Sequence, residues 1–294
     1  MPPGGGLARG FARVKLGEFD LHVVTDGTFR LDGGAMFGIV PKSLWSRIDP
    51  ADPRNRILIA LNPLLVSTGK DNILIDAGLG QTRAEKFRDI YDARCGRLTE
   101  SLSRLGVAPE EITVVIFTHL HFDHAGGATR AAGGGALEPV FPNARHVVQK
   151  MEWEDAHDSN ELTAGSYIVE ELDSLAQNVR LDLVDGDVEV APGIRAIVTG
   201  GHTRGHHLVL IESRSRTCIF PGDLVPMAGH VNLPYIMSYD LYPLETLSRK
   251  RKWLARTARE GWLCCFEHDP RLTFAHLHAA GPERLEVRPV EEDV

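Results

Sequence analysis

Three imidazoles and one carboxylate occupy six consecutive positions near the middle of the chain. They belong to His119, His121, Asp123 and His124. Neighbouring imidazoles repel one another when protonated, whereas a bound cation can replace their protons. The alternative, a group of surface or capping histidines, gives no reason for such a density. The run therefore predicts a metal site.

The residues on either side of this run indicate where it lies in the fold. Residues 113–117 form an apolar, β-branched stretch that is typical of a buried strand, and residues 125–128 are small enough for a tight turn. The histidine run thus follows the C-terminal end of a strand. Functional side chains of α/β proteins favour this position, because the strand is rigid and the loop after it is free to present them.

Other predicted strands also end in an acid or a histidine. The pairs of strand and residue are 72–76 with Asp76, 194–199 with His202, 217–220 with Asp223, and 262–266 with His268. Asp76 alone is weak support, since aspartate is common in turns and helix caps. Together these ends suggest that residues far apart in sequence meet at one site.

The remaining pattern indicates alternating strands and helices. Further strands are expected in a hairpin over 11–24 and over 57–67, 146–149, 179–184, 188–190 and 207–212, and helices over 82–92, 98–105, 150–157, 166–177 and 244–259. The order of strands after residue 179 suggests a meander, and residues 130–137 read as a flexible loop.

Residues 35–48 are apolar and aromatic but fit neither the helix nor the strand period. One interpretation is a loop in which Met36, Phe37, Ile39 and Trp45 line the entry of a substrate pocket or contact another subunit. The other is an irregular piece of ordinary core. The sequence leaves both open.

Composition limits the class of protein. The 294 residues are 43% hydrophobic, with a mean hydropathy of −0.13 and a net charge of −8. We expect one domain over 1–294 with a flexible lead at about 1–10. No dense basic block and no long apolar segment occurs, so neither nucleic acid nor a membrane is an expected partner. Four cysteines without CxxC spacing fit a reduced, cytoplasmic protein.

The motifs, taken in order, resemble those of the metallo-β-lactamase superfamily. They are Thr118-His-x-His-x-Asp-His124, Gly201-His-Thr-x-Gly-His206, Gly222-Asp223 and His268-Asp269, with Asp76 at the place of the first acidic motif. The resemblance covers about residues 55–270. It implies an α/β fold, an αββα sandwich of two mixed β-sheets flanked by helices, with a dinuclear metal centre at one edge.

Carried over residue by residue, the resemblance implies two metal subsites. One would hold its ion with His119, His121 and His202, the other with Asp123, His124 and His268, and Asp223 would bridge them. Asp76 is expected to orient a ligand histidine and His206 to be structural. Imidazole and carboxylate ligands suit two divalent ions, with zinc first and Mn, Fe or Co as alternatives. Between two such ions a bridging hydroxide can form near neutral pH and attack the substrate.

The sequences of residues 118–127 and of Phe141-Pro-Asn-Ala144 resemble those of one branch of this superfamily. That branch holds the N-acyl-homoserine lactonases, which act in quorum quenching, and the methyl-parathion-hydrolase-like phosphotriesterases. The lactonases have a tyrosine three positions after the bridging aspartate, and here Pro226 stands there. A leaving-group acid would then come from Asp123 or from a tyrosine between 227 and 243. The candidates there are Tyr235, Tyr239 and Tyr242.

The sequence therefore predicts a dinuclear metal-dependent hydrolase of a small amphiphilic ester, in the first place a lactone of the N-acyl-homoserine type. The alternatives are a phosphotriesterase, or a metal-binding sensor or redox protein without hydrolysis. The expected partner is a small-molecule substrate. A homodimer is compatible with the sequence.

Overall fold

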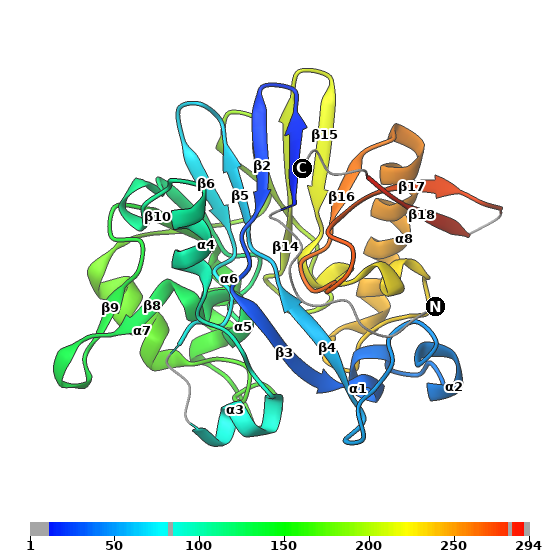
Figure 1. Cartoon of the computed structure of the whole chain (residues 1–294), viewed down its shortest axis with the longest axis horizontal. Helices are drawn as coiled ribbons and strands as arrows, with labels where there is room; N and C mark the ends of the chain where they lie inside the picture. Colours follow the sequence, from blue (N-terminus) through cyan, green and yellow to red (C-terminus); the bar gives the residue numbers. More distant parts are fainter. Residues whose placement is uncertain (1–11, 82–84, 282–283, 291–294) are drawn as a thin grey trace.

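A computed structural model describes residues 12–81, 85–281 and 284–290, in which two seven-stranded sheets face each other (Figure 1). The lead predicted at 1–10 lies outside the described residues. The first sheet has the order β1-β2-β5-β6-β7-β10-β11. Its strands are β1 (Arg13–Leu16), β2 (Phe19–Val23), β5 (Leu64–Ser67), β6 (Asn72–Ile75), β7 (Val114–Ile116), β10 (Arg145–Gln149) and β11 (Arg180–Val184). Pairing is antiparallel from β1 to β6 and parallel from β6 to β11.

The second sheet has the order β12-β13-β14-β15-β16-β17-β18. Its strands are β12 (Val188–Ala191), β13 (Ile194–Val198), β14 (His207–Ser213), β15 (Arg216–Phe220), β16 (Leu263–Cys265), β17 (Phe274–Ala279) and β18 (Leu285–Pro289). All neighbours are antiparallel except β15 and β16, which run parallel because α8 crosses between them. The sheet is mixed, as expected.

Helices cover the outer face of each sheet, and a shared core fills the space between the sheets. That core combines Val66 and Ile116 of the first sheet with Val209 and Phe220 of the second. The helices α4 (Leu98–Arg104), α6 (Lys150–His157) and α7 (Val169–Asn178) pack on the first sheet, and α8 (Pro243–Glu260) packs on the second. The αββα sandwich is confirmed.

Residues 33–48 form part of a smaller layer beside the sandwich. The layer joins β3 (Gly27–Asp32) and β4 (Arg56–Leu61) to α1 (Gly33–Phe37) and α2 (Lys42–Trp45). Met36, Phe37 and Trp45 are fully buried there, with Trp45 and Phe37 stacked 5.5 Å apart. The prediction that these three side chains line a substrate entry is therefore wrong. Of the four side chains named for the entry, Ile39 is the exposed one, at 90%.

Several elements differ from the expected ones for tertiary reasons. The strand expected over 57–67 divides at Asn62 and Pro63 into β4 and β5, which belong to different sheets. The meander holds for β12 to β15, whereas β11 leaves it and pairs in parallel with β10. The loop expected over 130–137 is flanked by the short pair β8 (Thr129–Ala131) and β9 (Leu137–Pro139). Of the helix expected over 82–92, α3 (Glu85–Tyr91) is described, while residues 82–84 lie outside the described part.

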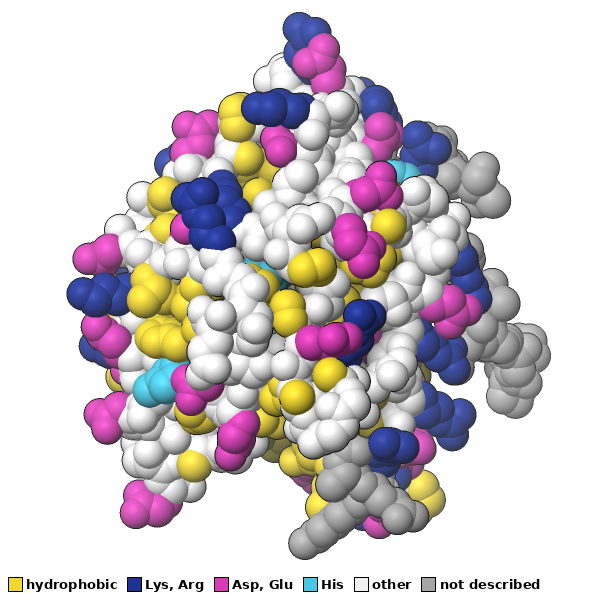
Figure 2. Space-filling model, turned by 90° about the vertical axis from the view of Figure 1, so that its left-hand side faces the viewer, with side chains coloured by type: hydrophobic (Ala, Val, Ile, Leu, Met, Phe, Trp, Pro, Cys, Tyr) yellow, Lys and Arg dark blue, Asp and Glu magenta, His cyan; other side chains and the backbone are white. Residues whose placement is uncertain are grey.

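The surface agrees with the sequence in charge pattern. On the face shown in Figure 2, basic and acidic side chains of the described chain are interspersed. Among the described helices, none combines the length and the apolar composition that a bilayer-spanning helix needs.

Candidate metal centre

The predicted ligands lie at one edge of the sandwich because the strands that carry them end there. Strand β7 leads into His119 and the short helix α5 (Phe122–Ala125), and β13 leads into the loop of His202. Strands β15 and β16, which are parallel neighbours, lead into Asp223 and His268. Since parallel strands bring their C-terminal ends to the same edge, residues up to 149 positions apart meet.

A first group of three imidazoles faces a common point. The side chains of His119, His121 and His202 offer ring nitrogens that all lie within 4.8 Å of one another. The shortest separation is 3.1 Å, between His202 Nε2 and His121 Nδ1. This is the first triad that the sequence predicted.

A second group contains two imidazoles and a carboxylate. His124 Nε2 and His268 Nε2 lie 3.1 Å apart, and each is 3.8 Å from Asp123 Oδ2. This is the second predicted triad.

Asp223 stands between the two groups. Its Oδ2 lies 3.2 Å from His202 Nε2 and 4.0 Å from His119 Nε2. Its Oδ1 lies 3.2 Å from His268 Nε2 and 3.6 Å from His124 Nε2. Each carboxylate oxygen therefore faces a different triad, which is the geometry of a bridging ligand.

The polar atoms of this cluster are suited to bind divalent metal ions. Among the described residues, His119 Nε2 and Asp223 Oδ1 are buried side-chain atoms without a hydrogen-bond partner. Burial and the surrounding imidazoles hold the pKa of His119 well below its usual value, so its ring is neutral and its lone pair is available. Burial opposes the charge of Asp223, but His202, His124 and His268 overcome it and hold its pKa well below the usual range. Burial opposes protonation of His124, His202 and His268, but neighbouring acids overcome it and raise the pKa of each ring. Zinc prefers neutral imidazole and ionised carboxylate, so its binding would displace protons from these three rings.

Contacts at Nδ1 orient the rings of His202, His268 and His124. His202 Nδ1 lies 2.8 Å from Asp240 Oδ1, and His268 Nδ1 lies 2.8 Å from the carbonyl of Ala60. His124 Nδ1 contacts two acids, Asp76 Oδ2 at 3.1 Å and Glu267 Oε2 at 3.2 Å. Such contacts fix the tautomer and aim the opposite nitrogen at a metal.

Two of these orienting acids were not found by sequence reasoning. Glu267 directly precedes His268, so its position beside a ligand candidate was the available signal. Asp240 lies 38 residues after His202 in an irregular segment, and its local sequence carries no sign of the contact. Asp76 contacts His124 as expected, and it adopts a left-handed conformation with φ 57°.

His206 supports the loop of Asp223. Its Nε2 accepts a hydrogen bond of 3.1 Å from the backbone N–H of Asp223, and its Nδ1 lies 2.5 Å from Thr199 Oγ1. The neighbouring Gly222 has φ 52°, and a Cβ there would lie 2.8 Å from His206 Nε2. Position 222 therefore requires glycine, which tolerates this backbone conformation and leaves room for the ring of His206.

The tyrosines proposed as acids occupy different environments. The ring of Tyr235 packs edge-on against Phe37, with centroids 5.9 Å apart, in the apolar layer. Tyr239 is 39% exposed; burial first, and then charges that include Asp123, raise its pKa to about 12. Tyr242 is also partly exposed.

One further tyrosine, Tyr91, was missed by sequence reasoning. Burial, and then the charge of Asp123, raise the pKa of Tyr91, and its ring lies 6.1 Å from that of Phe122 in the metal loop. The charge of Asp123 thus acts on the phenols of Tyr91 and Tyr239.

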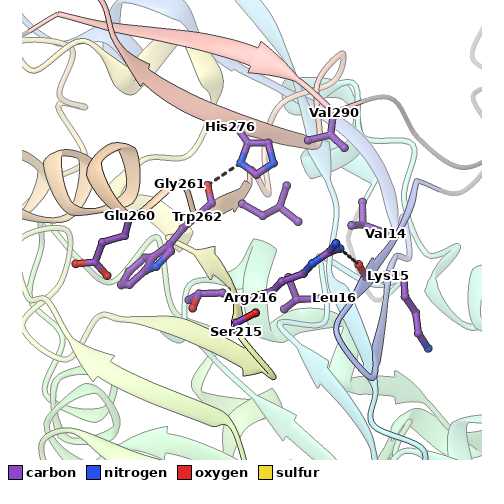
Figure 3. A pocket seen from close by; sticks show the side chains of 12 residues that line it. Val14, Lys15, Leu16, Ser215, Arg216, Glu260, Gly261, Trp262, His276 and Val290 are labelled. Carbon is purple, nitrogen blue, oxygen red and sulfur yellow. Dashed lines mark hydrogen bonds between the residues drawn. The ribbon is translucent and has the colours of Figure 1, made fainter.

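The structure also contains a cavity of about 360 Å³ (Figure 3). It is bordered by Arg216 and Leu263, which begin β15 and β16, whereas Asp223 and His268 follow the opposite ends of these strands. His276, which lines the cavity, lies with its Nδ1 3.1 Å from the carbonyl of Trp262. The cavity is therefore not part of the candidate metal centre.

Fold and cluster together define an αββα sandwich whose edge residues can hold divalent metal ions. The family model described as the Metallo-beta-lactamase superfamily matches residues 60–268, more than half of the chain. The chain belongs to this superfamily.

Relatives of known name agree with this assignment. An N-acyl homoserine lactonase of Bacillus sp is 38% identical over 117 residues, 40% of each chain. An N-acyl homoserine lactonase of Bacillus cereus is 29% identical over 173 residues, 55% of this chain and 62% of the relative. The chain thus spans about 40% to 62% of the length of these relatives.

Solved structures agree in fold. A probable metal-dependent hydrolase from Staphylococcus aureus is 31% identical, with a TM-score of 0.85, over 96% of this chain and 100% of that chain. AidC, a dizinc quorum-quenching lactonase with a bound product, superposes with a TM-score of 0.79 over 96% of this chain and 98% of its own, at 22% identity.

Proposed function

We propose that this protein is a dinuclear metal-dependent hydrolase that opens N-acyl-homoserine lactones and thereby acts in quorum quenching. The observation that carries the proposal is the position of Asp223, whose two oxygens face two separate groups of ligand candidates. The lactonase relatives supply the substrate class.

In this proposal His119, His121 and His202 hold one ion, Asp123, His124 and His268 hold the other, and Asp223 contacts both. The ions are zinc, which suits this donor set. Two such ions, when bound, supply an activated water and polarise the carbonyl of the substrate. The chain itself contributes the fixed orientation of the imidazoles, through Asp240, Asp76, Glu267 and the carbonyl of Ala60.

The opening of the lactone also needs a proton for the departing alkoxide, because an alcohol is a weak acid. Pro226, whose carbonyl accepts a hydrogen bond from the backbone of His268, stands where the lactonases have a tyrosine. We assign the donor role to Asp123 or to one of the phenols near it, Tyr239 or Tyr91. Tyr235 does not fit this role, since its ring lies in the apolar layer.

The same residue, Pro226, favours a second candidate function. An aryl phosphotriester expels a phenoxide, which leaves without a proton donor, so a centre that lacks the tyrosine suits such a substrate. Both transition states place negative oxygen beside the cations, so one centre can serve both reactions.

A substrate panel tests the assignment. The zinc-loaded protein is assayed with N-acyl-homoserine lactones of short and long acyl chain, an open-chain ester of the same acid, and an activated aryl phosphotriester. We expect the highest kcat/KM for a lactone. Faster turnover of the phosphotriester than of every lactone would assign the second function, and no turnover of any substrate would leave a metal-binding protein without hydrolysis.

A further inference from the structure

Glu152 is a fully buried carboxylate that lies outside the ligand set and is not used by the proposed chemistry. It belongs to the first turn of α6, and its residue is 0% exposed. Burial of an ionised group is costly unless hydrogen bonds replace its water. The described contacts of Glu152 supply three such bonds, each from a different segment of the chain.

The three donors surround both carboxylate oxygens. The backbone N–H of Leu120 and the hydroxyl of Tyr167 donate to Oε1, each at 3.1 Å. The hydroxyl of Thr203 donates to Oε2 at 2.6 Å. Burial raises the pKa of Glu152, whereas these three bonds favour its ionised form.

Each donor is next to a ligand candidate of the same triad. Leu120 lies between His119 and His121, and Thr203 directly follows His202. Tyr167 packs edge-on against His121, with ring centroids 5.1 Å apart. One carboxylate therefore restrains the positions of all three imidazoles that form the first triad.

The packing leaves these segments little freedom to shift. A Cβ at Gly205 would lie 2.5 Å from the backbone nitrogen of Glu152, so the loop of His202 lies directly on the start of α6. The segment of Tyr167 is held in turn by a hydrogen bond of 2.9 Å from the N–H of Phe122 to the carbonyl of Ser166.

The second triad is oriented by other groups. Asp76 and Glu267 contact His124, and the carbonyl of Ala60 contacts His268. None of the described hydrogen bonds of Glu152 reaches the residues that carry these groups.

We propose that Glu152 is a positioning residue that preforms the metal subsite of His119, His121 and His202 and leaves the subsite of Asp123, His124 and His268 unaffected. The inference rests on the proposed function, because it takes the ligand sets from it. It predicts that the two metal subsites can be weakened separately.

The test compares the affinities of the two metal equivalents in variants of the full chain. Glu152→Leu removes all three bonds, whereas Thr203→Val and Tyr167→Phe each remove one and leave the carboxylate in place. Lys150→Gln is the control, since Lys150 begins the same helix with its side chain 61% exposed. Zinc affinity is measured by competition with a chromophoric chelator, and folding by circular dichroism.

We expect one equivalent of zinc to bind about 10-fold to 100-fold more weakly in Glu152→Leu, the range seen when groups behind a metal ligand are removed. The other equivalent should keep its affinity, and the control should match the unmodified protein. Equal weakening of both equivalents, or of neither, would overturn the inference. If Glu152→Leu does not fold, the Thr203→Val and Tyr167→Phe variants decide by the same criterion.

The proposed function can fail separately. In that case the unmodified protein itself would bind fewer than two zinc ions per chain. A protein that binds two ions and opens lactones, but whose Glu152 variants bind both ions normally, would contradict only the role of Glu152.

Discussion

At the scale of single residues, Asp223 is the side chain on which the two-metal account depends. Its oxygens lie 3.2 Å from nitrogens of both triads. Asp223→Ala should lower the metal content below two ions per chain and reduce lactone turnover by more than about 10²-fold, since a ligand matters more than the groups behind it. Elemental analysis and kcat on the same preparation check this. Two ions per chain with near-normal kcat would rule out the bridge.

The proton donor is a second question at this scale. Tyr239→Phe and Tyr91→Phe are compared on a lactone and on an activated phosphotriester, with Tyr235→Phe as control. Loss of a general acid should lower kcat for the lactone about 10²-fold or more and leave the phosphotriester nearly unchanged. Equal kcat for the lactone in all three variants would exclude these phenols and leave Asp123 and Tyr242 as candidates.

Hydrophobic patterns located the strand ends at which histidines and acids gather, and the resemblance to the superfamily's motifs assigned seven of these residues as ligand candidates. The structure brings all seven together. Glu152, Asp240 and Glu267 escaped this reasoning for a different reason. The contacts of Glu152 and Asp240 depend on how α6 and the irregular segment before α8 return to the site, and no local pattern encodes that return. Glu267 directly precedes the ligand candidate His268, and this position was its available signal.

At the scale of elements, the layer of α1, α2, β3 and β4 acts as core. Trp45 is 1% exposed and stacks on Phe37. Trp45→Ala should lower the free energy of unfolding by about 3–5 kcal/mol. It should leave the ratio of kcat/KM between long-chain and short-chain lactones unchanged. Ile39→Ala, at an exposed position, is the control for stability. A rise of KM for long-chain lactones alone in Trp45→Ala would show instead that Trp45 lines the substrate entry.

A buried lysine on α8 gives a pH-dependent prediction. Lys250 donates hydrogen bonds to the carbonyls of Asn232 and Tyr235 at 2.8 and 2.6 Å. Burial lowers its pKa from 10.5 to about 7, although Asp240 opposes the shift. Between pH 7 and pH 10.5, Lys250 binds fewer protons in the folded chain than in the unfolded chain, so the free energy of unfolding rises with pH. Below about pH 7 Lys250 is charged in both states, and the folded chain carries the full cost of burying that charge.

Lys250→Met should therefore change the pH dependence of unfolding. Between pH 7 and 10 the free energy of unfolding of the unmodified protein should rise relative to the variant, by at most about 1.4 kcal/mol per pH unit. Denaturant titrations at several pH values measure the difference. Lys252→Met, at an exposed position on the same helix, is the control. Parallel curves for Lys250→Met and the unmodified protein would show that the charge of Lys250 does not matter.

At the scale of the whole molecule, the metal centre lies where the two sheets meet. Its residues come from β7 of the first sheet and from β13, β15 and β16 of the second, so ions bound there link both halves of the sandwich. An ion that binds the folded chain but not the unfolded chain stabilises the folded state, by about 2.7 kcal/mol when the free ion concentration is 100 times Kd. Removal of metal by a chelator should lower Tm, and added zinc should restore it. An unchanged Tm would contradict metal binding in the folded state.

The sandwich itself was predictable only through the resemblance of motifs. Strand patterns alone indicated many short strands, but not that β11 would leave the meander or that Asn62 and Pro63 would divide one predicted strand between two sheets. Both features depend on long-range strand pairing, and the local sequence does not distinguish one possible partner strand from another.

The proposed function requires that two ions at this edge together open a lactone. The most direct test is to add zinc stepwise to metal-free protein and to follow the opening of an N-acyl-homoserine lactone at each step. We expect no opening without zinc and a rate that stops rising at two equivalents per chain. Lactone opening by the metal-free protein, a plateau at one equivalent, or no opening at two equivalents would contradict it.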